Sequence, residues 1–131
     1  MSNISVIGAG GWGLALANIF SEKHNIKVWV HSEKSYKLLN ENHRNDNYLK
    51  NIELNKNIFF TMDIKEVVND SEIIIIVTPS FAFYEACKNI EPFIKNEQIL
   101  ISATKGLDRK TGKTMSEVAR SVISGDLNIL T

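Results

Sequence analysis

The apolar residues of this chain fall into short runs, rich in β-branched side chains, that alternate with stretches where apolar residues recur at helical spacing. The runs predict strands and the spaced stretches predict amphipathic helices. The predicted strands cover residues 3–7, 26–30, 58–60, 72–77, 98–102 and 128–131. The predicted helices cover residues 11–22, 32–42, 63–69, 81–94 and 114–123. This alternation indicates an α/β fold of the doubly wound, Rossmann-like type, with one parallel sheet in a single domain.

The fourth run, Glu72–Val77, is almost continuously apolar, as is typical of a strand buried on both faces of a parallel sheet. It ends at Thr78-Pro79-Ser80, where Ser80 is expected to cap the following helix. In a doubly wound sheet, the carboxyl ends of the first and fourth strands flank the point where the strand order reverses. The turn after Val77 is therefore expected to face the turn after the first strand.

The first turn contains Gly8, Gly10 and Gly13 in the spacing Gly-x-Gly-x-x-Gly, between a predicted strand and a predicted helix. Gly8 permits a sharp turn, Gly10 leaves room for a pyrophosphate, and Gly13 allows the helix to pack closely on the strand. The helix that begins near Gly11 would offer its unpaired amides and its dipole to the anion. A purely structural turn is the alternative. The second strand follows at the distance of a βαβ unit, which favours dinucleotide binding.

The end of the second strand bears on the choice between NAD and NADP. Glu33 lies near the distance at which a carboxylate binds the ribose of NAD and repels the 2′-phosphate of NADP. However, Ser32 is typical of a helix N-cap and Glu33 of a first-turn acid that serves the helix dipole. His31 is better placed to meet the adenosine end, and Lys34 is able to attract a phosphate. The sequence slightly favours NADP and leaves NAD open.

Three further candidate contacts lie in connecting segments. Residues 43–57 are polar and rich in asparagine, and long irregular connections inside compact domains are often functional. Tyr48 and Arg44 are therefore candidate cofactor contacts, with an ordinary solvated loop as the alternative. Lys105 follows the fifth strand on the same rim as the glycine turn, where it can reach a phosphate or carboxylate. An ordinary surface lysine is the alternative there.

Composition narrows the classes of partner. A chain of 131 residues is long enough for one domain with a core, and its 15 basic and 15 acidic residues give no excess charge for nucleic acid or anionic membranes. Small-molecule partners are expected. No apolar run reaches membrane-spanning length and the N-terminus lacks a signal pattern, so a cytoplasmic location and no membrane insertion are expected. Cys87 is predicted to be a buried structural thiol, and the spacing of the histidines predicts no metal site.

Several blocks of the sequence together resemble the bacterial-type NAD(P)-dependent glycerol-3-phosphate dehydrogenases. They are residues 8–17, 45–49, 77–80 and 102–107, with 111–113 and 115–118. The block from Ser102 to Leu107 is the most specific, and the resemblance covers essentially the whole chain. It implies a cofactor domain of an enzyme that reduces dihydroxyacetone phosphate to sn-glycerol 3-phosphate with NADH or NADPH, for phospholipid synthesis.

The resemblance also implies roles for particular residues. Gly11 and Trp12 would contact the cofactor diphosphate, His31 the adenosine end, and Tyr48 the cofactor as well. Lys105 would contact both the nicotinamide side of the cofactor and the substrate. Gly11 stands where the family commonly has serine, so the backbone amide is kept and a hydroxyl contact is lost.

In the family, an α-helical second domain follows the sixth strand and supplies the catalytic residues. The chain is therefore expected to be a dinucleotide-binding domain spanning residues 1–131 and truncated near strand six, with no catalytic residue of its own and negligible turnover. A homodimer is expected for the full-length enzyme. The alternatives are the cofactor domain of another two-domain dehydrogenase, such as a 6-phosphogluconate or ketopantoate type, and a non-catalytic NAD-sensing module.

Overall fold

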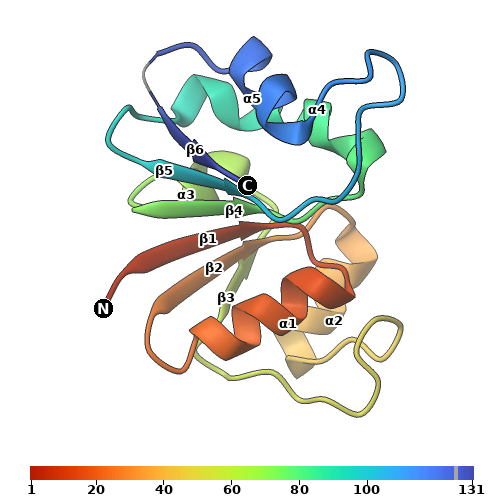
Figure 1. Cartoon of the computed structure of the whole chain (residues 1–131). Helices are drawn as coiled ribbons and strands as arrows, with labels where there is room; N and C mark the ends of the chain where they lie inside the picture. The colour runs from red at the N-terminus through yellow and green to blue at the C-terminus, as the bar shows by residue number, and fades with distance from the viewer. Residues whose placement is uncertain (126) are drawn as a thin grey trace.

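The strands lie parallel in one sheet, in the order β3-β2-β1-β4-β5-β6 (Figure 1). The computed structural model describes residues 1–125 and 127–131. The strands are β1 (Asn3–Ile7), β2 (Asn25–Trp29), β3 (Phe59–Thr61), β4 (Ile73–Ile76), β5 (Ile99–Ser102) and β6 (Asn128–Leu130). The helices are α1 (Gly11–Phe20), α2 (Glu33–Asn42), α3 (Ile64–Val68), α4 (Ser80–Ile90) and α5 (Met115–Val122), with a short 3₁₀ helix at Glu91–Phe93.

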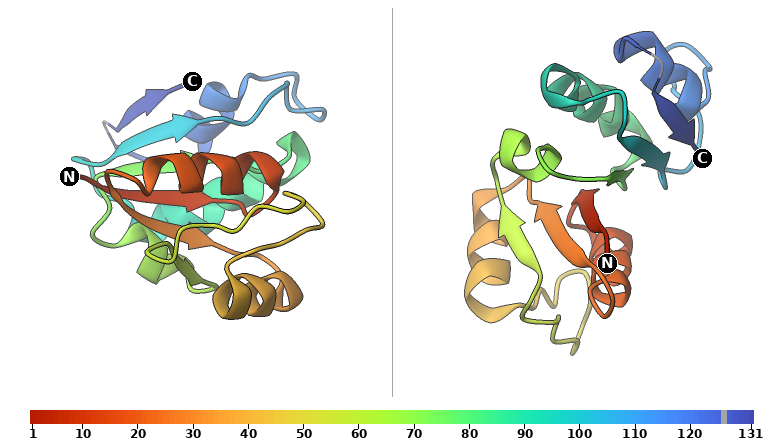
Figure 2. Two further views of the ribbon diagram at one scale, coloured as in Figure 1. Left: turned by 90° about the horizontal axis from the view of Figure 1, so that it is seen from below. Right: turned by 90° about the vertical axis from the view of Figure 1, so that its left-hand side faces the viewer.

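Helices cover both faces of the sheet, with α1 and α2 on one face and α4 and α5 on the other (Figures 1 and 2). Successive residues of β4 point to opposite faces, so Ile74 and Ile76 pack with α3, α4 and α5. Ile75 belongs to the core cluster on the other face, which includes residues of α1 and α2. The predicted burial of β4 on both faces is confirmed. None of the helices in the described part of the chain is long and apolar enough to cross a membrane.

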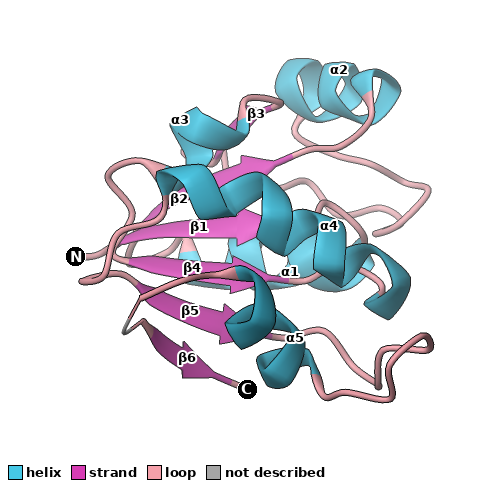
Figure 3. Ribbon diagram, turned by 90° about the horizontal axis from the view of Figure 1, so that it is seen from above, coloured by secondary structure: helices cyan, strands magenta, loops and turns pink. Residues whose placement is uncertain are grey.

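The strand order reverses at β1, which pairs with β2 on one side and β4 on the other. All strand arrowheads in Figure 3 point toward the same edge of the sheet, so the turns that follow β1 and β4 lie next to each other. This arrangement confirms the predicted doubly wound fold and creates the switch point at which such sheets bind ligands.

Two predicted details of the helices are wrong. Pro79, with extended backbone, takes the N-cap position of α4, so Ser80 is already the first helical residue and its hydroxyl lies one position too late to cap. The α-helix ends at Ile90 and not near Ile94, because the chain tightens into a 3₁₀ turn that holds Pro92 in its first positions. By contrast, the predicted Ser32 cap and the capping box of Thr114 and Glu117 are confirmed.

Candidate functional site

A crevice of about 420 Å³ opens at the carboxyl edge of the sheet, over the switch point. Its lining comes from the glycine turn, the end of β2, the turn after β4, one face of α4, and a single tyrosine of the long connection. The lining residues are Gly8, Ala9, Gly10, Trp29, Val30, His31, Ser32, Ser35, Tyr48, Val77, Thr78, Pro79, Phe81, Ala82, Glu85, Ala86 and Asn89. The turn after β4 thus faces the glycine turn, as predicted.

Two of the three motif glycines are required by the protein's own packing. Gly8 has a φ of +128°, and a Cβ there would lie 2.7 Å from the carbonyl oxygen of Val77. A Cβ on Gly13 would lie 2.3 Å from the carbonyl oxygen of Gly8. The turn after β1 thus lies so close to Val77, and the start of α1 so close to the turn, that a side chain would not fit at either position. Gly8 and Gly13 are therefore explained without a ligand.

Gly10 is different. Its φ of −79° and ψ of −175° are extended values that any residue adopts. Apart from its two chain neighbours, no described residue has a heavy atom within 4 Å of a Cβ built at this position. Gly10 also lines the crevice and is the N-cap of α1, which receives no side-chain cap among the described residues. The space in front of a helix N-terminus with open amides fits an anionic group such as a diphosphate.

Across from the glycine turn, Thr78 adds a polar group to the crevice. Its Oγ1 is buried and has no hydrogen-bond partner among the described residues. Buried hydroxyls without a partner are uncommon in folded proteins. Thr78 also lines the crevice, so an unpaired buried hydroxyl lies close to its wall.

The end of β2 forms the side of the crevice where doubly wound folds bind adenosine. The ring of His31 lies 5.7 Å from the ring of Trp29, and the Nε1 of Trp29 donates to the carbonyl oxygen of Met62 at 3.0 Å. His31 therefore rests on a fixed aromatic support. Glu33 and Lys34 are exposed and lie outside the lining. The carboxylate of Glu33 instead lies 3.5 Å from the Nζ of Lys37.

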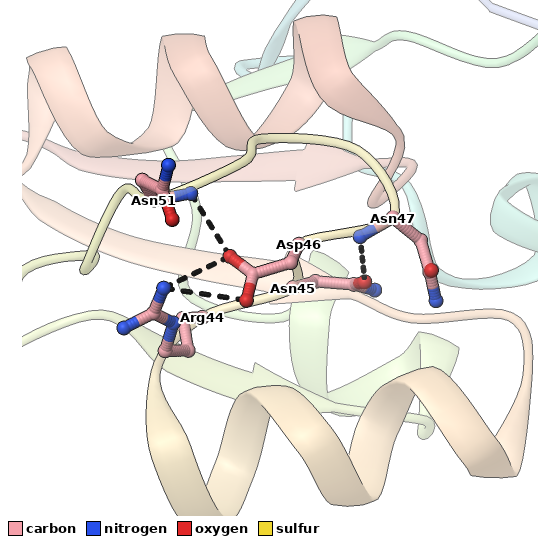
Figure 4. Close-up of polar contacts among 5 residues, drawn as sticks. All are labelled: Arg44, Asn45, Asp46, Asn47 and Asn51. Carbon is pink, nitrogen blue, oxygen red and sulfur yellow. Dashed lines mark hydrogen bonds and ion pairs between the residues drawn. The ribbon is translucent and has the colours of Figure 1, made fainter.

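The long connection between α2 and β3 is irregular, as predicted, and is held by its own polar groups (Figure 4). The carboxylate of Asp46 accepts from the Nη2 of Arg44 at 3.0 and 3.3 Å and from the backbone N of Asn51 at 3.0 Å. These bonds, with that of Arg44 the largest cause, lower the pKa of Asp46. Arg44 is thus turned toward Asp46 and lies outside the crevice lining.

The connection brings Tyr48 to the crevice and against the start of α1. A Cβ on Gly11 would lie 3.2 Å from the carbonyl oxygen of Tyr48, so the two segments are in close contact. Figure 2 shows the connection passing beside α1. The approach gives a physical reason for glycine at position 11, because any side chain there would press on the connection.

The remaining predicted contacts lie near the crevice but outside its lining. Trp12 is exposed on the first turn of α1, and Lys105 is exposed after β5. A Cβ on Gly106 would lie 3.9 Å from the side chain of Ser80, which puts the segment of Lys105 beside the start of α4. The structure therefore gathers Gly8, Gly10, His31 and Tyr48 around the crevice and leaves Gly11, Trp12, Gly13 and Lys105 at its margins.

The sequence interpretation missed the face of α4 that lines the crevice. Ala82, Glu85, Ala86 and Asn89 recur at spacings of three and four residues, which puts them on one side of a helix. Small residues at 82 and 86, on a helix that follows the switch-point strand, are the signal that points to this face. On the opposite side of the same helix, Cys87 is buried, which raises the pKa of its thiol to about 12 and confirms it as a structural thiol.

Within residues 1–125 and 127–131, no group of three or more histidine, cysteine, aspartate or glutamate side chains is arranged to hold a metal ion.

The sheet order, the glycine turn and the crevice over the switch point define a Rossmann-type, doubly wound α/β domain.

The sequence matches, over residues 3–131, the family described as NAD-dependent glycerol-3-phosphate dehydrogenase N-terminus, and the chain belongs to that family. It is 79% identical over 131 residues to a glycerol-3-phosphate dehydrogenase [NAD(P)+] of Brachyspira hyodysenteriae. The aligned region covers 100% of this chain and 39% of that protein. A Staphylococcus haemolyticus protein of the same name is 37% identical over 98% of this chain and 39% of its own length. The chain thus spans about two fifths of the curated relatives it matches.

The fold is shared with solved structures. A glycerol-3-phosphate dehydrogenase from Coxiella burnetii superposes with a TM-score of 0.88 at 26% identity, covering 98% of this chain and 39% of that one. A ketopantoate reductase from Ralstonia eutropha gives a TM-score of 0.77 at 11% identity, which shows a shared fold alone.

Proposed function

We propose that this chain is the nicotinamide-dinucleotide-binding part of a glycerol-3-phosphate dehydrogenase, spanning residues 1–131. The observation that carries the proposal is Gly10, a glycine that neither its backbone angles nor its neighbours require, at the mouth of a crevice in front of a helix N-terminus. A bound diphosphate gives that glycine a reason, because a Cβ would occupy the space of the phosphate oxygens. The relatives' names, which include NAD(P)+, support the choice of cofactor.

The residues of the chain then have distinct tasks. The amides at the start of α1 hold the diphosphate, with Gly11 and Trp12 beside it and Gly13 keeping the helix close to the turn. His31 and Tyr48 contact the cofactor from the two sides of the crevice that they line. The nicotinamide, when bound, supplies the hydride.

We place the substrate, dihydroxyacetone phosphate or sn-glycerol 3-phosphate, on the side of Lys105. Its ammonium is exposed on the carboxyl edge, next to the start of α4, where it can meet the phosphate of the substrate. Hydride transfer requires the substrate to be held against the nicotinamide in a near-attack geometry. We assign that task to a helical domain beyond the family's N-terminal part. The 131-residue chain by itself is therefore proposed to bind cofactor and turn over negligibly, and the full enzyme to act as a cytoplasmic homodimer in phospholipid synthesis.

The proposal is tested by calorimetric titration of the chain with NADH and with NADPH, each with and without dihydroxyacetone phosphate. Saturable binding of a dinucleotide, with little response to the substrate, is the expected result. Absence of binding by both dinucleotides would contradict the proposal and leave the glycine turn as a purely structural feature.

A further inference from the structure

The crevice has an unusual distribution of charge for a site that would accept NADP. Among the described residues that line it, Glu85 is the one carboxylate, and no lysine or arginine lines it. The 2′-phosphate that distinguishes NADP carries close to two negative charges at neutral pH and is normally met by a cation.

Glu85 lines the same crevice as the residues at the end of β2, where doubly wound folds bind adenosine. It comes from the second turn of α4, and Ala86 and Asn89 on the same helix face share the lining with it. The lining also includes His31 after β2, and Ser32 and Ser35 at the start of α2. No residue of the segment after β5, where the nicotinamide side is expected, belongs to the described lining. A phosphate on the 2′-oxygen of the adenosine ribose would therefore enter a crevice in which the exposed carboxylate of Glu85 is the one acidic side chain of the described lining and no lysine or arginine is present.

The neighbouring cations are directed elsewhere. The Nζ of Lys88 on α4 lies 5.5 Å from the centre of the Tyr84 ring, in a separate groove between α4 and α5. Lys37 pairs with Glu33, and Lys34 is exposed outside the lining. Glu33 stands near the position at which doubly wound folds have the acid that binds the ribose of NAD. Its carboxylate lies 3.5 Å from the Nζ of Lys37, and Glu33 is outside the described crevice lining. Besides Glu85, the titratable groups among the described lining residues are those of His31 and Tyr48.

We infer that Glu85, from α4, is the residue that makes this crevice select NADH over NADPH, by repelling the 2′-phosphate. This inference rests on the proposed function and specifies the cofactor of the same site. It reverses the slight preference for NADP expected from Glu33, His31 and Lys34, because only His31 of those three reaches the crevice.

The test compares Glu85→Gln with the matched control Glu33→Gln, using NADH and NADPH as ligands. Titrations are made at low ionic strength and at a pH of about 8, where imidazole groups in general carry no charge. The wild-type chain is expected to bind NADH more tightly. Glu85→Gln is expected to narrow the NADH-to-NADPH affinity ratio about tenfold, mainly by improving NADPH. Glu33→Gln is expected to leave the ratio unchanged.

The dependence of the NADH-to-NADPH affinity ratio on salt distinguishes electrostatic repulsion by Glu85 from a merely steric effect of its side chain. Raising the ionic strength to about 1 M shortens the screening length to about 3 Å, so the wild-type ratio is expected to fall toward that of Glu85→Gln. A ratio unchanged by Glu85→Gln, or one moved by Glu33→Gln instead, would overturn the assignment while leaving the proposed function intact. Failure of the wild-type chain to bind either dinucleotide would overturn both.

Discussion

At the scale of single residues, the three motif glycines separate into two kinds. Gly8 and Gly13 are required by contacts within the protein, with Val77 and with Gly8 itself. Gly10 is required by nothing in the described part of the chain. The glycines of one motif are therefore explained by two different constraints, one from packing within the fold and one from a ligand. Substitution of each glycine by alanine distinguishes these two constraints.

Gly13→Ala is expected to destabilise the chain by about 1–3 kcal/mol, because its Cβ would meet the backbone carbonyl of Gly8, which cannot move without disturbing the turn. This is the net cost, after the roughly 1 kcal/mol that alanine gains over glycine inside a helix. Denaturant unfolding of the variant measures it.

Gly10→Ala serves as the matched control. It is expected to change the free energy of unfolding by less than about 0.5 kcal/mol and to weaken NADH binding strongly. Equal loss of stability in both variants would contradict the distinction between them.

At the scale of elements, the connection between α2 and β3 shows how a segment without regular structure is held in place. Asp46 bonds Arg44 and Asn51, and the segment lies against the start of α1 through Tyr48. The sequence suggested a cofactor contact or a solvated loop for Arg44 and did not predict its pair with Asp46, which depends on how the connection folds. The same limit applies to α4. Its sequence pattern predicted the helix, but whether Glu85 and Asn89 line the crevice depends on where the sheet order places that helix.

The pH dependence of this connection follows from the lowered pKa of Asp46. Because the folded-state pKa lies below its ordinary value of 3.8, the stabilisation is fully present above that value and is lost as the pH falls through the folded-state pKa. Asp46→Asn is therefore expected to lower the melting temperature near neutral pH and to converge with the wild type near a pH of about 2. Thermal melts across this range measure the difference, and a gap that persists unchanged at low pH would count against the role of the carboxylate.

At the scale of the whole molecule, the fold could be predicted almost completely and the site about half. Strand and helix periodicity is local, and the alternation of strands with helices, together with the near-continuous apolar run of β4, indicated a doubly wound parallel sheet, which the structure has. The site depends on distances between segments far apart in sequence. His31 and Tyr48 could be proposed from their positions and from the family resemblance, whereas the face of α4 appeared only once the helix was packed across from β2.

The most direct test of a dinucleotide site at the switch point is to map NADH onto the backbone amides of the chain by heteronuclear NMR. Saturating NADH is expected to shift the amides of Gly10, Gly11 and His31 most, followed by those around Tyr48 and Ala82. The amides of α5, which lie away from the crevice, should remain unchanged. Shifts centred on the groove between α4 and α5, or no shifts at all, would contradict a dinucleotide site at this turn.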